Sequence, residues 1–110
     1  MIMRMRLLGT LLAFSVVPAA GAADLAAGAA KAKEVCAACH GADGASPTSP
    51  DYPKLAGQHR DYLEKALRDY KSGARKNAIM AGFAAALSKQ DIENLAAHYH
   101  GLPAVLATRY

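Results

Sequence analysis

Several signals are absent from this sequence, and each absence argues against a class of protein. No stretch alternates between apolar and polar residues as a half-buried strand does, and no internal repeat is present. No Ser/His/Asp arrangement, phosphate-binding loop or pair of carboxylates stands out, so acid–base and nucleophilic catalysis have no support. The basic residues form no dense run and are not interleaved with aromatic residues, which argues against nucleic acid as a partner.

Cysteine is scarce, because the chain has only two, and both fall within Cys36-Ala37-Ala38-Cys39-His40. The pattern Cys-x-x-Cys-His is typical of covalent attachment of c-type haem. Cysteines at i and i+3 lie about one helical turn apart, so both sulfurs can reach the two vinyl groups on one half of a porphyrin. The next residue, His40, can offer its imidazole to the iron from that face. We therefore predict one haem c per chain, held by Cys36 and Cys39, with His40 as an axial ligand.

Three other interpretations of this motif remain open from the sequence. A thioredoxin-like redox pair needs a βαβ context, and no strand pattern lies near the motif. A zinc site needs about four ligands; His59, His98 and His100 could supply nitrogen, but no second short-spaced pair matches a known zinc arrangement. A disulfide across two residues would be strained.

The first residues have the features of a secretory signal peptide, for which we predict the range 1–23. Two arginines precede an apolar stretch over residues 7–17, and small residues fill positions 18–23. Cleavage after Ala22 or Ala23 fits this pattern. The alternative is a retained membrane anchor, but the apolar stretch is shorter than the ~20 residues of a comfortable span. We expect export to the periplasm and no membrane span after processing, since bacteria attach haem to such motifs outside the cytoplasmic membrane.

Removing 23 of the 110 residues leaves one small domain, residues 24–110. A chain this short has a limited core, and a buried, covalently bound haem would add apolar surface and two covalent links. Its basic residues gather between 54 and 76, where seven cations accompany three acids. This modest basic face could steer docking onto an acidic partner, although an ordinary solvated helix face explains it equally well.

Helical spacing of apolar residues predicts an all-α domain with three main helices. The predicted ranges are 24–35, 59–72 and 88–101. Residues 41–53 are predicted as a loop because glycine and proline interrupt them repeatedly. Residues 73–87 are predicted to be less regular, and they hold Met80.

Iron in an electron carrier needs a second axial ligand opposite His40. Outside the predicted signal peptide, the candidates are Met80, His59, His98 and His100. Met80 is the only thioether among them, and thioether ligation favours ferrous iron and raises the reduction potential. We predict Met80 as this ligand, with a histidine as the alternative.

With these residues placed, the sequence resembles the bacterial class I cytochromes c, and it is most similar to the cytochrome c553, c5 and c4 group. The segments that carry the resemblance are residues 36–44, 53–58, 72–80, 87–92 and 95–99. The resemblance implies a small class I cytochrome c fold, with three main helices around one covalent haem. It also implies electron transfer rather than enzymatic catalysis.

The resemblance implies further roles for single residues. Gly28 of the first helix would pack on Tyr99, an aromatic of the last helix. Pro53 would accept a hydrogen bond from the ring of His40, and such a bond fixes the imidazole and increases its basicity. Arg75 would contact a haem propionate or the neighbouring loop. The side chains expected to line the haem pocket are Tyr52 and Tyr70.

The expected function is that of a monomeric periplasmic electron-transfer protein. Its expected partners are redox proteins: a membrane cytochrome complex, an oxidase, a reductase or a dehydrogenase. One alternative is a permanent cytochrome subunit of a periplasmic dehydrogenase, with the tail 102–110 either binding the partner or covering the haem or the first helix. A second alternative is a haem-based ligand sensor, or an enzyme with an open iron site, which would require Met80 to be off the iron.

Overall fold

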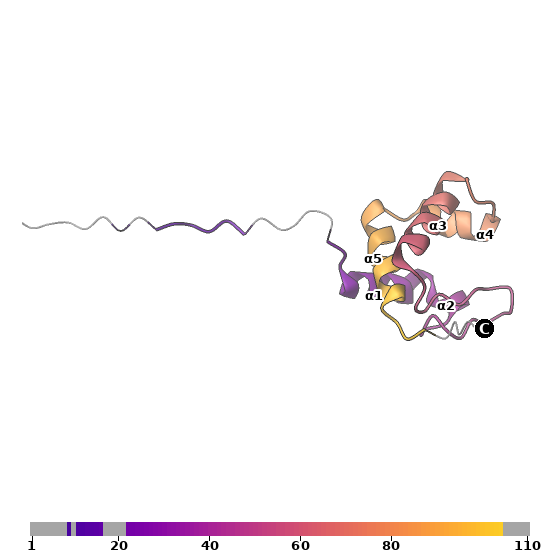
Figure 1. Ribbon diagram of the computed structural model, residues 1–110. Helices are drawn as coiled ribbons and strands as arrows, with labels where there is room; N and C mark the ends of the chain where they lie inside the picture. Colours follow the sequence, from indigo (N-terminus) through magenta and orange to yellow (C-terminus); the bar gives the residue numbers. More distant parts are fainter. Residues whose placement is uncertain (1–8, 10, 17–21, 105–110) are drawn as a thin grey trace, which may run out of the picture.

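The computed structural model describes residues 9, 11–16 and 22–104, and within them the chain is helical without strands (Figure 1). The helices in chain order are α1 (Leu25–Val35), α2 (Ala37–His40), α3 (Arg60–Ser72), α4 (Ala78–Ala85) and α5 (Lys89–His100). The all-α prediction is confirmed. The three main helices expected from the sequence correspond to α1, α3 and α5, whereas α2 and α4 were not anticipated as separate elements.

Most of the predicted signal peptide lies outside the described residues. Of the part that is described, residues 9, 11–16 and 22 are exposed and residue 23 is partly buried, and none of them is helical. Of the described residues, none belongs to a helix long and apolar enough to cross a membrane. The cleavage of residues 1–23 therefore stays a prediction.

Local capping signals explain where the three main helices begin and end. Asp24 accepts a hydrogen bond from the Ala27 backbone at the start of α1. Ser88 and Asp91 form a reciprocal capping box at the start of α5, as their spacing predicts. Gly73 ends α3 in a left-handed conformation with φ of 86°, which glycine adopts without steric cost.

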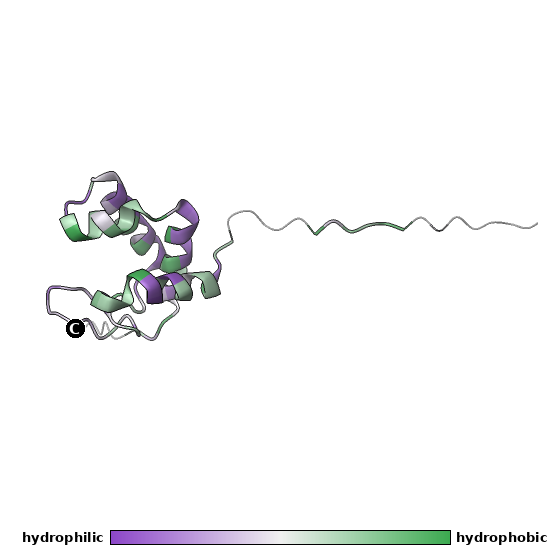
Figure 2. Ribbon diagram, turned by 180° about the vertical axis from the view of Figure 1, so that it is seen from behind, coloured by the Kyte–Doolittle hydropathy of each residue, from purple (hydrophilic) through white to green (hydrophobic). Residues whose placement is uncertain are grey.

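The segment 73–87 is more regular than the sequence indicated, and the expectation of irregular structure was wrong. Residues 78–85 form α4, and Met80 lies in its first turn. Asn77 caps this helix by accepting a hydrogen bond from the Met80 backbone at 3.0 Å. The helix is apolar on nearly all sides, as the green colour of α4 in Figure 2 shows, so it lacks the polar face that periodicity analysis detects.

The core lies where α1 and α3 pack on α5. Its buried side chains include Leu63 of α3 together with Ile92, Leu95 and Tyr99 of α5. Leu102 packs against this cluster, so the described start of the predicted tail belongs to the core. Residues 105–110, with the rest of that tail, lie outside the described residues.

Gly28 marks the close crossing of α1 and α5, but its partner differs from the one that the resemblance implied. A Cβ built on Gly28 would overlap the backbone carbonyl of Asn94 and lie 3.1 Å from Cβ of His98. The ring of Tyr99 packs instead beside Gly44, where an added Cβ would lie 2.8 Å from Cδ1 of the ring. The expected pairing with Tyr99 was wrong because Asn94 and His98, one turn apart, form the face of α5 that meets α1.

Gly28→Ala is expected to lower the free energy of unfolding by about 1–3 kcal/mol, because a rigid backbone carbonyl occupies the space of the new methyl group. Gly82→Ala is the matched control, since Gly82 is also helical and a Cβ there meets nothing within 4 Å. Helix propensity alone should make the control neutral or up to ~1 kcal/mol more stable. Chemical denaturation followed by circular dichroism measures both. Equal stability of the two variants would contradict the close crossing.

Candidate haem site

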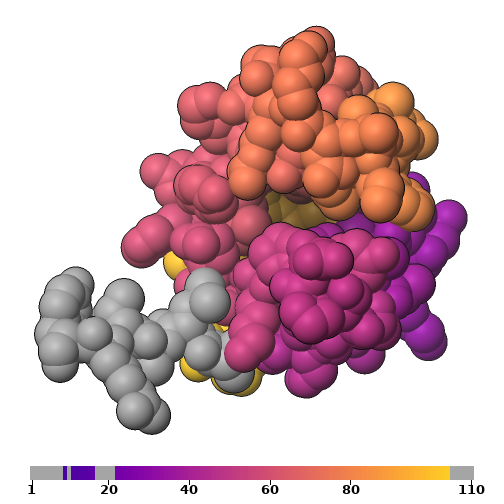
Figure 3. Space-filling view, turned by 90° about the vertical axis from the view of Figure 1, so that its right-hand side faces the viewer, coloured from indigo at the N-terminus to yellow at the C-terminus, as the bar shows by residue number. Residues whose placement is uncertain are grey.

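A cavity of about 620 Å³ separates α3 and α4 on one side from α2 and the following loop on the other. Figure 3 looks into it, with α4 in orange above, the loop in magenta below and α5 in yellow at the back. Its walls are mainly aliphatic and aromatic side chains, including Leu63, Leu67 and Leu95. This volume lies within the ~300–1,000 Å³ that is usual for cofactor pockets.

Both cysteines of the motif line this cavity. Cys36 ends α1 and begins α2, and backbone hydrogen bonds from Cys39 and His40 to its carbonyl close one helical turn. Both thiols are free and partly buried. Within the described residues, no group of three or more His, Cys, Asp or Glu is arranged to hold a metal ion.

Tyr99 contacts the first cysteine, and sequence analysis did not find this pairing because the two residues are far apart along the chain. Its side chain is 4% exposed, and its hydroxyl forms a hydrogen bond with the Cys36 thiol. Burial raises the pKa of the Cys36 thiol, while the hydrogen bond from Tyr99 acts in the opposite direction.

His40 is buried at the edge of the cavity, and its ring is held by one hydrogen bond. Nδ1 lies 2.8 Å from the carbonyl oxygen of Pro53. A carbonyl can only accept, so Nδ1 carries the proton and Nε2 keeps its lone pair for a metal. The contact that the resemblance implied for Pro53 is present. Its effect on an iron ligand stays a prediction.

Met80 reaches the cavity from α4, across from the side that carries His40 (Figure 1). Its side chain is partly buried. The alternative ligands His59, His98 and His100 are not among the residues that line the cavity. The His100 ring instead lies 2.8 Å from the Gln58 carbonyl oxygen, and His98 packs edge-on against the ring of Tyr99.

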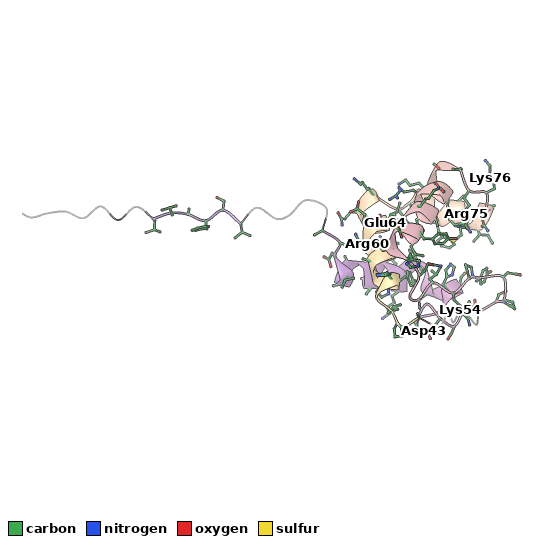
Figure 4. The ribbon with its side chains drawn as sticks, in the orientation of Figure 1. Asp43, Lys54, Arg60, Glu64, Arg75 and Lys76 are labelled. Carbon is green, nitrogen blue, oxygen red and sulfur yellow. The ribbon has the colours of Figure 1, made fainter. Side chains whose placement is uncertain are left out.

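Arg75 stands at the cavity wall beside two tyrosines (Figure 4). Its Nη1 lies 3.4 Å from the Tyr62 hydroxyl, and its guanidinium carbon lies 4.8 Å from the centre of the Tyr70 ring. Tyr52 also lines the cavity, with its ring centre 6.4 Å from that of His40. The structure thus brings Arg75, Tyr52 and Tyr70 to the cavity. The propionate role of Arg75 stays a prediction.

Two lining residues of α4 were missed by the sequence analysis. Ile79 and Phe83 face the cavity together with Met80. The available signal was their spacing, because residues at i and i+4 share one side of a helix. This spacing was not used because residues 73–87 were not expected to form a helix.

These residues fit a haem. Two thiols one turn apart and an imidazole with a free Nε2 lie on one side of an apolar cavity, and a thioether lies on the other. An apolar lining excludes water from the iron and suits a large flat ring.

Comparisons with known proteins point to one family. The cytochrome c family matches residues 25–102 of this chain. Over 55 residues the chain is 47% identical to cytochrome c4 of Stutzerimonas stutzeri, a match that covers 46% of this chain and 26% of that protein. Over 53 residues it is 45% identical to the thiosulfate dehydrogenase electron acceptor of Stutzerimonas stutzeri (strain A1501), covering 48% and 24%. The matches thus span about a quarter of these relatives.

The fold is also found among solved structures. Reduced recombinant cytochrome c4 from Pseudomonas stutzeri superposes with a TM-score of 0.68 at 42% sequence identity. The match covers 74% of this chain and 47% of that one. The resemblance to class I cytochromes c is confirmed, as is their fold.

Proposed function

Because this chain belongs to the cytochrome c family, we propose that it is a periplasmic electron-transfer protein with His40 and Met80 as axial ligands of one covalent haem c. Covalently bound haem c is the cofactor of this family, and Cys36 and Cys39 have the spacing that its attachment requires. The observation that supports the ligand pair is the cavity itself, which His40 and Met80 line from different elements.

The haem supplies one-electron chemistry, and the chain supplies attachment, ligation and a dry pocket. His40 is oriented by the Pro53 carbonyl, which increases the basicity of its free nitrogen. Met80 would supply a thioether as the second ligand, and such ligation raises the reduction potential relative to a second histidine. With both positions filled, no site remains for a substrate, so the proposed role is that of a carrier rather than an enzyme.

The proposed location is the periplasm. The support is the predicted signal peptide over residues 1–23 and the need for haem attachment outside the bacterial cytoplasmic membrane. After cleavage, the mature chain would be a monomeric single-haem domain, residues 24–110.

Cations near the cavity favour a redox partner with an acidic surface. The cations of α3 are partly neutralised on the helix itself, since Arg60 and Arg68 both pair with Glu64. Lys54 and Arg75 line the cavity from different sides, and Lys76 follows Arg75 (Figure 4). Complementary charge mainly accelerates encounter and orients the partners. The proposed partners are a membrane cytochrome complex, an oxidase, a reductase or a dehydrogenase.

A second candidate is the cytochrome subunit of a periplasmic dehydrogenase. The observation that favours it is the similarity to a protein named as the electron acceptor of thiosulfate dehydrogenase. The redox chemistry would be the same, but the partner would be permanent. Co-purification of a stoichiometric dehydrogenase with the chain from its native periplasm would favour this candidate over a free carrier.

Absorption spectra test the proposed function directly. The protein, produced with haem maturation, is measured oxidised, reduced, and reduced under carbon monoxide. We expect a low-spin c-type spectrum that carbon monoxide does not change, because both axial positions are filled. A carbon monoxide shift in the wild-type protein would instead indicate an open sixth position and favour a ligand sensor.

A further inference from the structure

The helix that carries Met80 is attached to the domain mainly through one neighbour. α4 packs against α3, whereas α1 and α3 both pack against α5 (Figure 1). Two of its side chains, Ile79 and Phe83, face the cavity that the haem would fill. Before α4, Gly73 has a left-handed backbone, and the loop that follows is held to α3 by the Arg75 backbone, which donates a hydrogen bond of 3.1 Å to the Asp69 carbonyl. The direction of α4 therefore depends on a few specific contacts.

One of these contacts joins three elements at the far end of α4. The ammonium group of Lys71, in the last turn of α3, donates a hydrogen bond to the backbone carbonyl of Leu87. Leu87 follows α4, its backbone N–H binds the Ala84 carbonyl at 3.1 Å, and its side chain is 5% exposed in the core. Lys71 thus connects α3 to the corner between α4 and α5.

Charged and polar groups at the start of α5 also lie near this corner. The Asp91 carboxylate accepts a hydrogen bond of 2.9 Å from the Ser88 backbone. That bond holds the pKa of Asp91 below its usual range, and the nearby charges of Lys31 and Lys71 act in the same direction. Lys71 thus donates to the Leu87 carbonyl and also contributes positive charge near the Asp91 carboxylate.

We propose that Lys71 is a positioning residue that fixes α4 so that Met80 stays on the haem iron. The inference rests on the proposed ligation by Met80. The two ends of α4 then have complementary anchors. Asn77 binds the Met80 backbone at the start, and Lys71 binds the Leu87 carbonyl just beyond the end. Loss of the second anchor lets α4 move away from the cavity and increases the population in which Met80 is off the iron.

The experiment measures how easily free imidazole replaces Met80 on the ferric protein. Lys71→Met keeps the aliphatic chain but removes the ammonium group, and Lys71→Arg restores a cationic donor. Lys65→Met is the matched control, because Lys65 lies on the same helix, is largely exposed and pairs with Asp69 rather than with the corner after α4. Both methionine variants remove one positive charge, so a general charge effect is the same in each.

We expect Lys71→Met to lower the Kd for imidazole about tenfold, which corresponds to about 1.4 kcal/mol. Lys65→Met should change it less than twofold, and Lys71→Arg should restore most of the wild-type value. An unchanged affinity in Lys71→Met, even with lower unfolding stability, would overturn the positioning role. An equal effect of Lys65→Met would do the same, because charge alone would then explain it.

The proposed ligation is tested separately in the same samples. The wild-type ferric protein should show the absorption band that arises from charge transfer between a methionine sulfur and iron, and this band should disappear as imidazole binds. Absence of the band in the wild type would refute Met80 ligation itself. Presence of the band together with equal imidazole affinities would refute only the role of Lys71.

Discussion

Cys36→Ala combined with Cys39→Ala is expected to abolish covalent haem attachment and to leave a poorly folded chain. Without thiols, no thioether bond to the porphyrin can form, so haem should be absent from the protein band on a denaturing gel. The matched control is Ala38→Ser, which alters an exposed residue of the same turn and leaves both thiols in place. The control should retain haem at the wild-type level. Haem that survives denaturation in the double variant would contradict the attachment site.

The double variant is expected to fold poorly because the core and the haem cavity share side chains. Leu63, Leu95 and Tyr99 belong to the buried cluster and also line the cavity. Burial of one large apolar side chain is worth ~1.5–3 kcal/mol, so losing the group that would cover cavity-lining side chains such as Ile79 and Phe83 should cost several such amounts. Small domains have a total stability of only ~5–15 kcal/mol. Circular dichroism should therefore show reduced helix content and a broad thermal transition for the double variant.

Local signals explain why much of the fold could be predicted from the sequence. Helix caps depend on residues close together in the chain, so Asp24, Ser88 with Asp91, and Gly73 mark the helix ends correctly. The unanticipated helix α4 shows the limit of this approach. Its run of alanine, isoleucine, methionine and phenylalanine has no polar face, and only the Asn77 cap signals its start.

In the site, too, the contacts between residues close in sequence could be predicted, whereas those between distant segments could not. The spacing of Cys36, Cys39 and His40 within one turn determines which side they share, so the sequence was sufficient for that half. Contacts between distant segments depend on how helices cross, and neither spacing nor composition gives this information. That is why the Tyr99 contact with Cys36 was missed, and why the partner of Gly28 was misassigned.

Met80→Ala is expected to open the sixth coordination position and to lower the reduction potential strongly. Met80 lines the cavity, and the three histidines other than His40 in the described residues do not, so no second histidine is in place to replace it. The ferrous variant should bind carbon monoxide readily, and the charge-transfer band should be lost. The potential should fall by a sizeable part of the ~0.8 V over which axial ligands set haem potentials.

Ile79→Ala is the matched control for this variant, because Ile79 precedes Met80 on α4, lines the same cavity and has no ligating atom. It should keep the band and remain insensitive to carbon monoxide, with at most a small change in potential. If Met80→Ala kept the spectrum and potential of the wild type, the assignment of Met80 would be wrong. A histidine would then have to reach the iron, and the hydrogen bond between His100 and Gln58 or the packing of His98 on Tyr99 would have to break. In the NMR spectrum of the ferrous protein, shifted imidazole resonances would identify which histidine had moved to the iron.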